Sequence, residues 1–139
     1  MAKSTGESRL AKKSGKPNAV YQPDRGHFVY LDFTPHAGTE QGGRRPALIL
    51  SPLDYNIATG LAVACPITNQ VKGSPFEVTI PRGAKITGVV LADQFRSVDW
   101  VSRNASFHSI APFNTIAEVL GRIEAILQID LDAPPASSD

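Results

Sequence analysis

The chain has 139 residues, of which 42% are hydrophobic, 19% are charged and 7% are aromatic, and its formal net charge is +1. This length suits one domain, and the ordinary apolar fraction excludes a chain that is disordered throughout. No apolar run approaches the roughly 18 residues that a membrane-spanning helix needs, and we expect no secretory signal at the N-terminus. Because Cys65 is the only cysteine, an intrachain disulfide is excluded and a cytoplasmic location is favoured.

Charge is distributed unevenly along the chain. Residues 1–19 contain five basic residues and one acidic residue, whereas the other 120 residues contain nine basic and twelve acidic ones. The first segment has few large apolar side chains, so we expect a flexible basic tail there. Such a tail either adds attraction to phosphates or is an uninvolved extension. Residues 131–139 are predicted to be a disordered acidic tail, which leaves residues 20–130 as the folded domain.

The folded domain opens with two predicted strands on either side of a long loop. Residues 26–33 alternate in polarity, which indicates a strand. Residues 34–45 are polar and rich in glycine, and loops of this length in compact domains are often functional. The apolar run at 47–51 predicts a buried strand whose start is pinned by Pro46. Residues 52–56 predict a turn or a single helical turn.

More short strands follow in the second half of the domain. Residues 61–68 predict a strand in which Pro66 indicates a sheet edge or a bulge. Residues 76–80 alternate cleanly in polarity. A further strand is expected to start at residue 88, to bend, and to continue to residue 100. Residues 105–111 give a weaker strand pattern of mixed polarity.

One amphipathic helix is predicted at the end of the domain. Thr115-Ile-Ala-Glu118 matches a capping box at a helix start. Apolar residues then recur on one helical face, namely Ile116, Val119, Leu120, Ile123, Ile126 and Leu127. Several short strands and one helix together predict a mainly β (α+β) fold, a small and strongly curved antiparallel sheet or barrel.

Most familiar catalytic patterns are missing from the sequence. The three histidines are scattered, no metal-ligand spacing is evident, and there is no phosphate-binding loop. The segment that does suggest chemistry is 40–46, Glu-Gln-Gly-Gly-Arg-Arg-Pro. Pro46 restricts Arg45 to an extended backbone, and a guanidinium held there can grip a phosphate through two parallel hydrogen bonds. An ordinary surface ion pair with Glu40 is the alternative.

Several segments form a recognisable combination in a fixed order. The central one is G-x-E-Q-x-G-x-R-P at 38–46, followed by an apolar strand and Ser-Pro; the others are 21–26, 31–33, 66–68, 72–73, 75–78 and 88–94. Together they resemble the MazF/PemK toxin family over about residues 20–128. The resemblance implies a small SH3-like barrel fold, a homodimer, and sequence-specific cleavage of single-stranded RNA without a metal. It also implies a cognate, MazE-like antitoxin whose tail covers the active site.

The resemblance also implies which residues form the site. Arg45 and Thr68 match the catalytic arginine and threonine, and Glu40 matches an acidic position whose role is less defined. We expect RNA contacts from Gln41, Arg44, Lys72, Gln94 and Arg96. Ser74 replaces an aromatic residue that close relatives often have, so their RNA specificity is not carried over.

The mechanism we expect is attack of the RNA 2′-hydroxyl on the adjacent phosphate, which leaves a 2′,3′-cyclic phosphate and a 5′-hydroxyl. Arg45 would stabilise the charge on the phosphoryl oxygens, Thr68 would donate a hydrogen bond, and Glu40 would orient Arg45 or accept a proton. Cleavage of mRNA would inhibit translation and growth. Two alternatives stay open, a CcdB-like non-enzymatic gyrase poison and an SH3-like protein-binding module.

Overall fold

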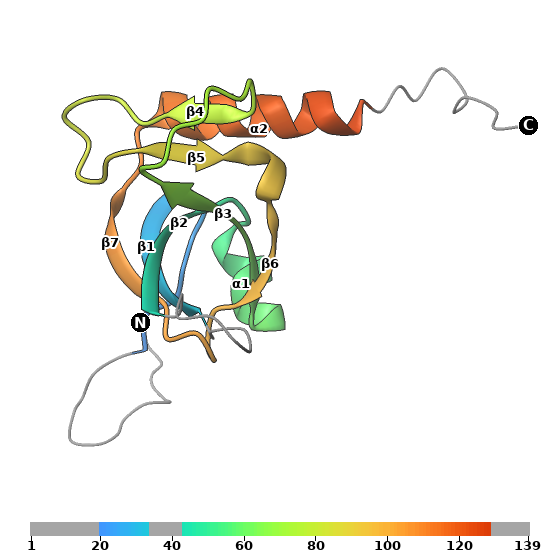
Figure 1. Ribbon diagram of the computed structural model, residues 1–139. Helices are drawn as coiled ribbons and strands as arrows, with labels where there is room; N and C mark the ends of the chain where they lie inside the picture. The colour runs from blue at the N-terminus through green and yellow to red at the C-terminus, as the bar shows by residue number, and fades with distance from the viewer. Residues whose placement is uncertain (1–19, 34–42, 129–139) are drawn as a thin grey trace, which may run out of the picture.

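The computed structural model describes residues 20–33 and 43–128 (Figure 1). The predicted tails at 1–19 and 131–139 and most of the predicted loop at 34–45 lie outside these residues. The elements, in chain order, are β1 (His27–Phe33), β2 (Gly43–Ile49), α1 (Leu53–Thr59), β3 (Leu61–Thr68), β4 (Glu77–Thr79), β5 (Val89–Leu91), the 3-10 helix η1 (Ala92–Gln94), β6 (Arg96–Asp99), β7 (Ser106–Ile110) and α2 (Phe113–Leu127). Neither α-helix in this part of the chain has the length and apolar character needed to span a bilayer.

The strands form an antiparallel sheet in the order β4-β5-β3-β2-β1-β7, and β6 also pairs with β3. The first half of β3 pairs with β6, and its last two residues, Ile67 and Thr68, pair with β5. Figure 1 shows β4 and β5 lying across the end of the curved β1–β3 layer, with α2 running along them. Among the described strands, β4 and β7 end the order, so the sheet is curved but does not close into a barrel. The predicted curved antiparallel sheet with a C-terminal helix is confirmed.

The curved sheet buries side chains on both of its faces. Phe28 and Leu48 belong to one apolar cluster together with Val119 of α2, and their neighbours Val29 and Ile49 belong to a second cluster. Successive residues of a strand point to opposite faces. A strand that is covered on both sides therefore shows a continuous apolar run, which accounts for the lack of alternation after Pro46.

Three expectations about prolines and helix ends are wrong. Pro46 lies inside β2, opposite Tyr30, because the strand already begins at Gly43. Of the two alternatives predicted from Pro66, the sheet edge is wrong because β3 lies between β5 and β2, and the bulge stays a prediction. Pro66 instead falls between the part of β3 that pairs with β6 and the part that pairs with β5. A residue without an N–H group is thus located where the strand changes partners.

The predicted capping box is also wrong. Helix α2 begins at Phe113, its N-cap is Pro112, and no side chain caps its start. The backbone N–H of Thr115 donates to the carbonyl of Pro112 at 3.0 Å, and the threonine side chain is buried inside the first turn. Pro112 has φ −60° and ψ 142°, so its extended backbone sets the entry to the helix.

Asn56 joins α1 to the rest of the domain through buried hydrogen bonds. Its side-chain amide donates to the carbonyls of Pro23 and Ser51, both at 2.9 Å, and its backbone carbonyl accepts from the indole N–H of Trp100 at 3.1 Å. The side chain is fully buried. Removing it would leave two carbonyls without their donor, and unsatisfied buried groups are costly.

We therefore expect Asn56→Ala to lower the free energy of unfolding by about 2–4 kcal/mol. Urea denaturation followed by circular dichroism measures the change. Asn114→Ala, at an exposed position of α2, is the control and should stay within about 0.5 kcal/mol of the parent protein. Equal stability of the two variants would contradict the role given to Asn56.

Candidate active site

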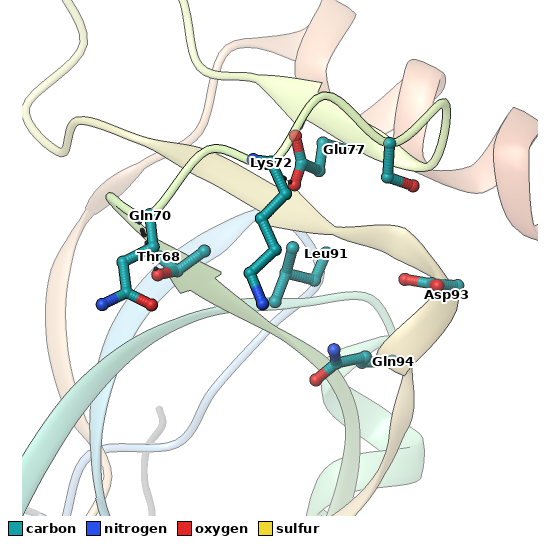
Figure 2. Close-up of a pocket in the computed structure, with 8 residues that line it drawn as sticks. Thr68, Gln70, Lys72, Glu77, Leu91, Asp93 and Gln94 are labelled. Atoms are coloured by element: carbon teal, nitrogen blue, oxygen red, sulfur yellow. Dashed lines mark hydrogen bonds between the residues drawn. The ribbon is translucent and has the colours of Figure 1, made fainter.

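A pocket of about 280 Å³ opens where the end of β3 meets β5 and η1 (Figure 2). The residues that line it are Thr68, Gln70, Lys72, Ser74, Glu77, Leu91, Asp93 and Gln94. All of them except Leu91 have polar side chains. Such a lining offers many hydrogen-bond donors and acceptors, so the pocket suits a polar ligand.

Thr68 is held at the mouth of this pocket by the backbone around it. It is the last residue of β3, and it lies opposite Val89 of β5. Its hydroxyl oxygen accepts the backbone N–H of Gln70 at 3.0 Å. A hydroxyl that accepts one hydrogen bond still has its own proton to donate. Thr68 can therefore donate to a ligand without giving up the contact that orients it.

Lys72 and Gln94 reach the same pocket from different elements. Lys72 belongs to the segment between β3 and β4, and Gln94 is the last residue of η1. Figure 2 shows the Lys72 side chain crossing the pocket beside Leu91, with Thr68 and Gln70 on one side and Gln94 on the other. Three residues expected to touch RNA or to act in catalysis, Thr68, Lys72 and Gln94, are thus brought together.

Arg45 lies in β2, opposite Leu31 of β1, and it is exposed. It is not among the residues that line the pocket. Ala47 of β2 pairs with Pro66 of β3, and the same register continued by two residues would set Arg45 against Thr68. Steps of two residues stay on one face of a sheet. The register thus favours a common face for the two residues predicted to be catalytic.

Glu40 and Gln41, predicted as a catalytic and an RNA-binding residue, lie outside the described residues. Within residues 20–33 and 43–128, no group of three or more His, Cys, Asp or Glu side chains is arranged to hold a metal ion.

The guanidinium of Arg44 is engaged in a network within the protein. It donates to the Asp32 carboxylate at 2.6 Å, to the Asn104 carbonyl at 2.8 Å and to the Ser106 hydroxyl at 2.7 Å. Hydrogen bonds from Asn104 and then from Arg44 lower the pKa of Asp32. The network ties the end of β1 to the start of β2 and to the segment before β7. Its RNA contact stays a prediction.

Arg96, another expected RNA contact, lies at the start of β6 opposite Ala64. Its guanidinium carbon is 5.7 Å from the ring centre of Phe33, and that of Arg103 is 5.4 Å from the same ring. Both distances suit a cation–π interaction. Arg96 does not line the pocket of Figure 2, so the structure does not group it with Thr68 and Lys72.

Sequence reasoning missed three polar residues of the pocket, Gln70, Glu77 and Asp93, whereas Ser74 was noted as a departure from the family pattern that bears on RNA specificity. Two of them could have been found from the family resemblance, because Glu77 lies within the matching 75–78 segment and Asp93 stands next to Gln94 in the matching 88–94 segment. Gln70 lies in a connection with no periodicity, and only the folded chain brings it to the pocket.

Known structures place this fold in a defined class. The crystal structure of MazE–MazF from Deinococcus radiodurans aligns with a TM-score of 0.75 at 55% sequence identity, covering 79% of this chain and 99% of that chain. The endoribonuclease toxin MazF of Escherichia coli K12 is 48% identical over 86 residues, which are 62% of this chain and 77% of the relative. The endoribonuclease PemK of Escherichia coli is 37% identical over 108 residues, 75% of this chain and 81% of the relative.

The fold and these alignments place the chain among small toxins of curved-sheet architecture. Residues 24–127 match the family of PemK-like, MazF-like toxins of type II toxin–antitoxin systems, and the chain belongs to that family. The resemblance seen in the sequence is confirmed.

Gly88 allows β5 to approach the carbonyl of Thr68 closely. A Cβ atom at this position would collide with that oxygen, and the backbone has φ +116°. We expect Gly88→Ala to lower the free energy of unfolding by about 3 kcal/mol or more, since strain and collision add. Gly83→Ala is the matched control, because Gly83 has φ +92° but the added carbon would meet no described residue within 4 Å apart from its chain neighbours.

For Gly83→Ala the backbone strain alone predicts a loss of about 1–2 kcal/mol. Chemical denaturation of both variants measures the difference. If Gly88→Ala were no less stable than Gly83→Ala, the close contact between β5 and Thr68 would be contradicted.

Proposed function

We propose that this toxin, an endoribonuclease like the relatives named above, cuts single-stranded RNA at a short specific sequence and thereby stops translation and growth. The observation that carries the proposal is the polar pocket at the end of β3, where Thr68, Lys72 and Gln94 meet. In the reaction, the RNA 2′-hydroxyl oxygen loses its proton and bonds to the adjacent phosphorus, while the bond to the 5′-oxygen breaks and that oxygen takes up a proton. The products are a 2′,3′-cyclic phosphate and a 5′-hydroxyl.

The proposed roles follow from the chemistry of each side chain. Arg45 stabilises the negative charge that grows on the phosphoryl oxygens, and Thr68 donates a hydrogen bond to the same group. An arginine is a poor base because its guanidinium stays protonated at neutral pH. Glu40 is therefore the group proposed to orient Arg45 or to take the proton of the 2′-hydroxyl. The reaction as proposed needs no metal ion.

The lining of the pocket supports an RNA substrate. Lys72 offers a cation for a phosphate, while Gln94 offers an amide that can both donate to and accept from a base edge. Because DNA lacks the 2′-hydroxyl, the proposed reaction cannot cut it. The proposal sets the enzyme in the cytoplasm, where it would meet mRNA.

We propose two protein partners as well. Phe107, Ile110 and Phe113 are exposed at β7 and the start of α2, with 47%, 64% and 77% of their surface accessible, which supports self-association into a homodimer. The alignment with MazE–MazF supports a cognate antitoxin. An acidic antitoxin segment would compete with RNA for Arg45 and Lys72.

Cleavage of a synthetic single-stranded RNA tests the proposal. We expect Arg45→Ala and Thr68→Ala each to lower kcat by about 10²–10³-fold, as removal of one transition-state donor does. Arg82→Ala, which removes an exposed arginine outside the pocket, is the control and should cleave normally. Mass spectrometry should find 2′,3′-cyclic phosphate ends, and cleavage should persist in EDTA.

The same assay separates the two alternatives. A gyrase poison or a protein-binding module would leave the RNA intact at any protein concentration. Cleavage that continues unchanged in Arg45→Ala would remove the proposed role of the arginine while leaving the enzyme class in place. DNA of the same sequence should survive in every reaction.

A further inference from the structure

The connection between β3 and β4, residues 69–76, forms one rim of the pocket and carries Lys72 and Ser74. This connection has no helix or strand of its own, so its shape depends on contacts made to it. Glu77, the first residue of β4, makes two of them. Its carboxylate oxygens accept the backbone N–H of Lys72 at 3.0 Å and that of Gly73 at 2.9 Å.

The two N–H groups form a small anion site that the chain fills with its own carboxylate. Gly73 has φ +84°, in the left-handed region that favours glycine. Successive N–H groups next to a left-handed residue make a concave site for an anion. Hydrogen bonds from a backbone N–H to a charged carboxylate are roughly twice as strong as neutral ones. Glu77 therefore holds this part of the rim firmly.

The Lys72 ammonium does not contact the Glu77 carboxylate but extends across the pocket (Figure 2). Figure 2 shows the Lys72 side chain leaving the backbone beside Glu77 and extending across the pocket, so that its ammonium lies away from the Glu77 carboxylate. Within residues 20–33 and 43–128, the ion pairs are Arg44–Asp32 and Arg122–Glu118. Glu77 thus binds the backbone of Lys72 without neutralising its side chain.

A second anchor holds the other end of the same connection. The guanidinium of Arg122, on α2, donates a hydrogen bond to the carbonyl of Pro75. The backbone N–H of Glu77 itself donates to the carbonyl of Ser74 at 3.1 Å. The connection is thus tied to β4 at Lys72 and Gly73 and to the C-terminal helix at Pro75.

We propose that Glu77 is a positioning residue for RNA binding, which holds the backbone of Lys72 and Gly73 so that the Lys72 ammonium meets an RNA phosphate in the pocket. This inference rests on the proposed function. If Glu77 acted only through its charge, its effect on RNA binding would be the opposite one. A carboxylate beside the pocket repels a phosphate, so its removal would tighten RNA binding if Glu77 acted only through its charge.

Two variants of Glu77 separate position from charge. Glu77→Gln keeps the shape but turns one acceptor into a donor, and Glu77→Asp keeps the charge but shortens the reach. We expect both to raise KM for the RNA substrate about tenfold, as loss of a charge-assisted contact does, with kcat changed less than about twofold. Glu124→Gln, an equal loss of charge at an exposed position of α2, is the control and should leave both constants unchanged.

The salt dependence of binding shows whether Glu77 acts through Lys72. Loss of one phosphate contact to a single strand should reduce the slope of log K against log salt by about 0.7. We expect this reduction in Lys72→Ala and in Glu77→Gln, and no further change when the two are combined, since both remove the same contact. Additive losses of affinity in the double variant would overturn the inference.

Trypsin gives a readout that needs no RNA. The bond after Lys72 should be cut faster in folded Glu77→Gln than in the parent protein or in Glu124→Gln, because Glu77 holds both flanking N–H groups. Circular dichroism confirms that each variant is folded. If the parent protein cuts RNA but Glu77→Gln has an unchanged or lower KM and an unchanged trypsin rate, the inference about Glu77 is overturned while the proposed function stands. If the parent leaves RNA intact, the proposed function fails.

Discussion

The pocket depends on one strand that serves two parts of the sheet. β3 pairs with β6 along Leu61–Ala64 and with β5 at Ile67 and Thr68. The change of partner bends the sheet, so that β4 and β5 lie across the end of the β1–β3 layer (Figure 1). Thr68, the last residue of β3, therefore emerges at the angle between the two parts, where side chains from η1 and from the β3–β4 connection also gather.

Some of these elements could be predicted from the sequence, and others could not. Alternation in polarity located β1 and β4, and the apolar run after Pro46 located a buried strand, because local pattern follows burial. The capping box failed because Thr115 matches the pattern but its side chain is buried, while Pro112 begins the helix. Pro66 misled for a similar reason, since a proline suits the point where a strand changes partners as well as a sheet edge.

The candidate site was likewise predicted only in part. The ordered motifs included Thr68, Lys72 and Gln94, and the fold brings these three around one pocket. The contact that shapes the rim could not be predicted, because nothing in the 75–78 segment indicates that the Glu77 carboxylate binds the amides of Lys72 and Gly73. A conventional interpretation would pair Glu77 with the side chain of Lys72. Only three-dimensional structure shows which part of a residue a charge contacts.

The distribution of charge makes such positioning important. Outside residues 1–19, acidic residues outnumber basic ones by twelve to nine, so the body of the protein offers little long-range attraction to a polyanion. Affinity for RNA would then depend on a few short contacts, whose strength falls steeply when a charge is displaced. A lysine on a connection without secondary structure is a poor contact unless its backbone is held. Using a carboxylate to bind two backbone amides meets this need, because it fixes the connection and leaves the lysine charge available in the pocket.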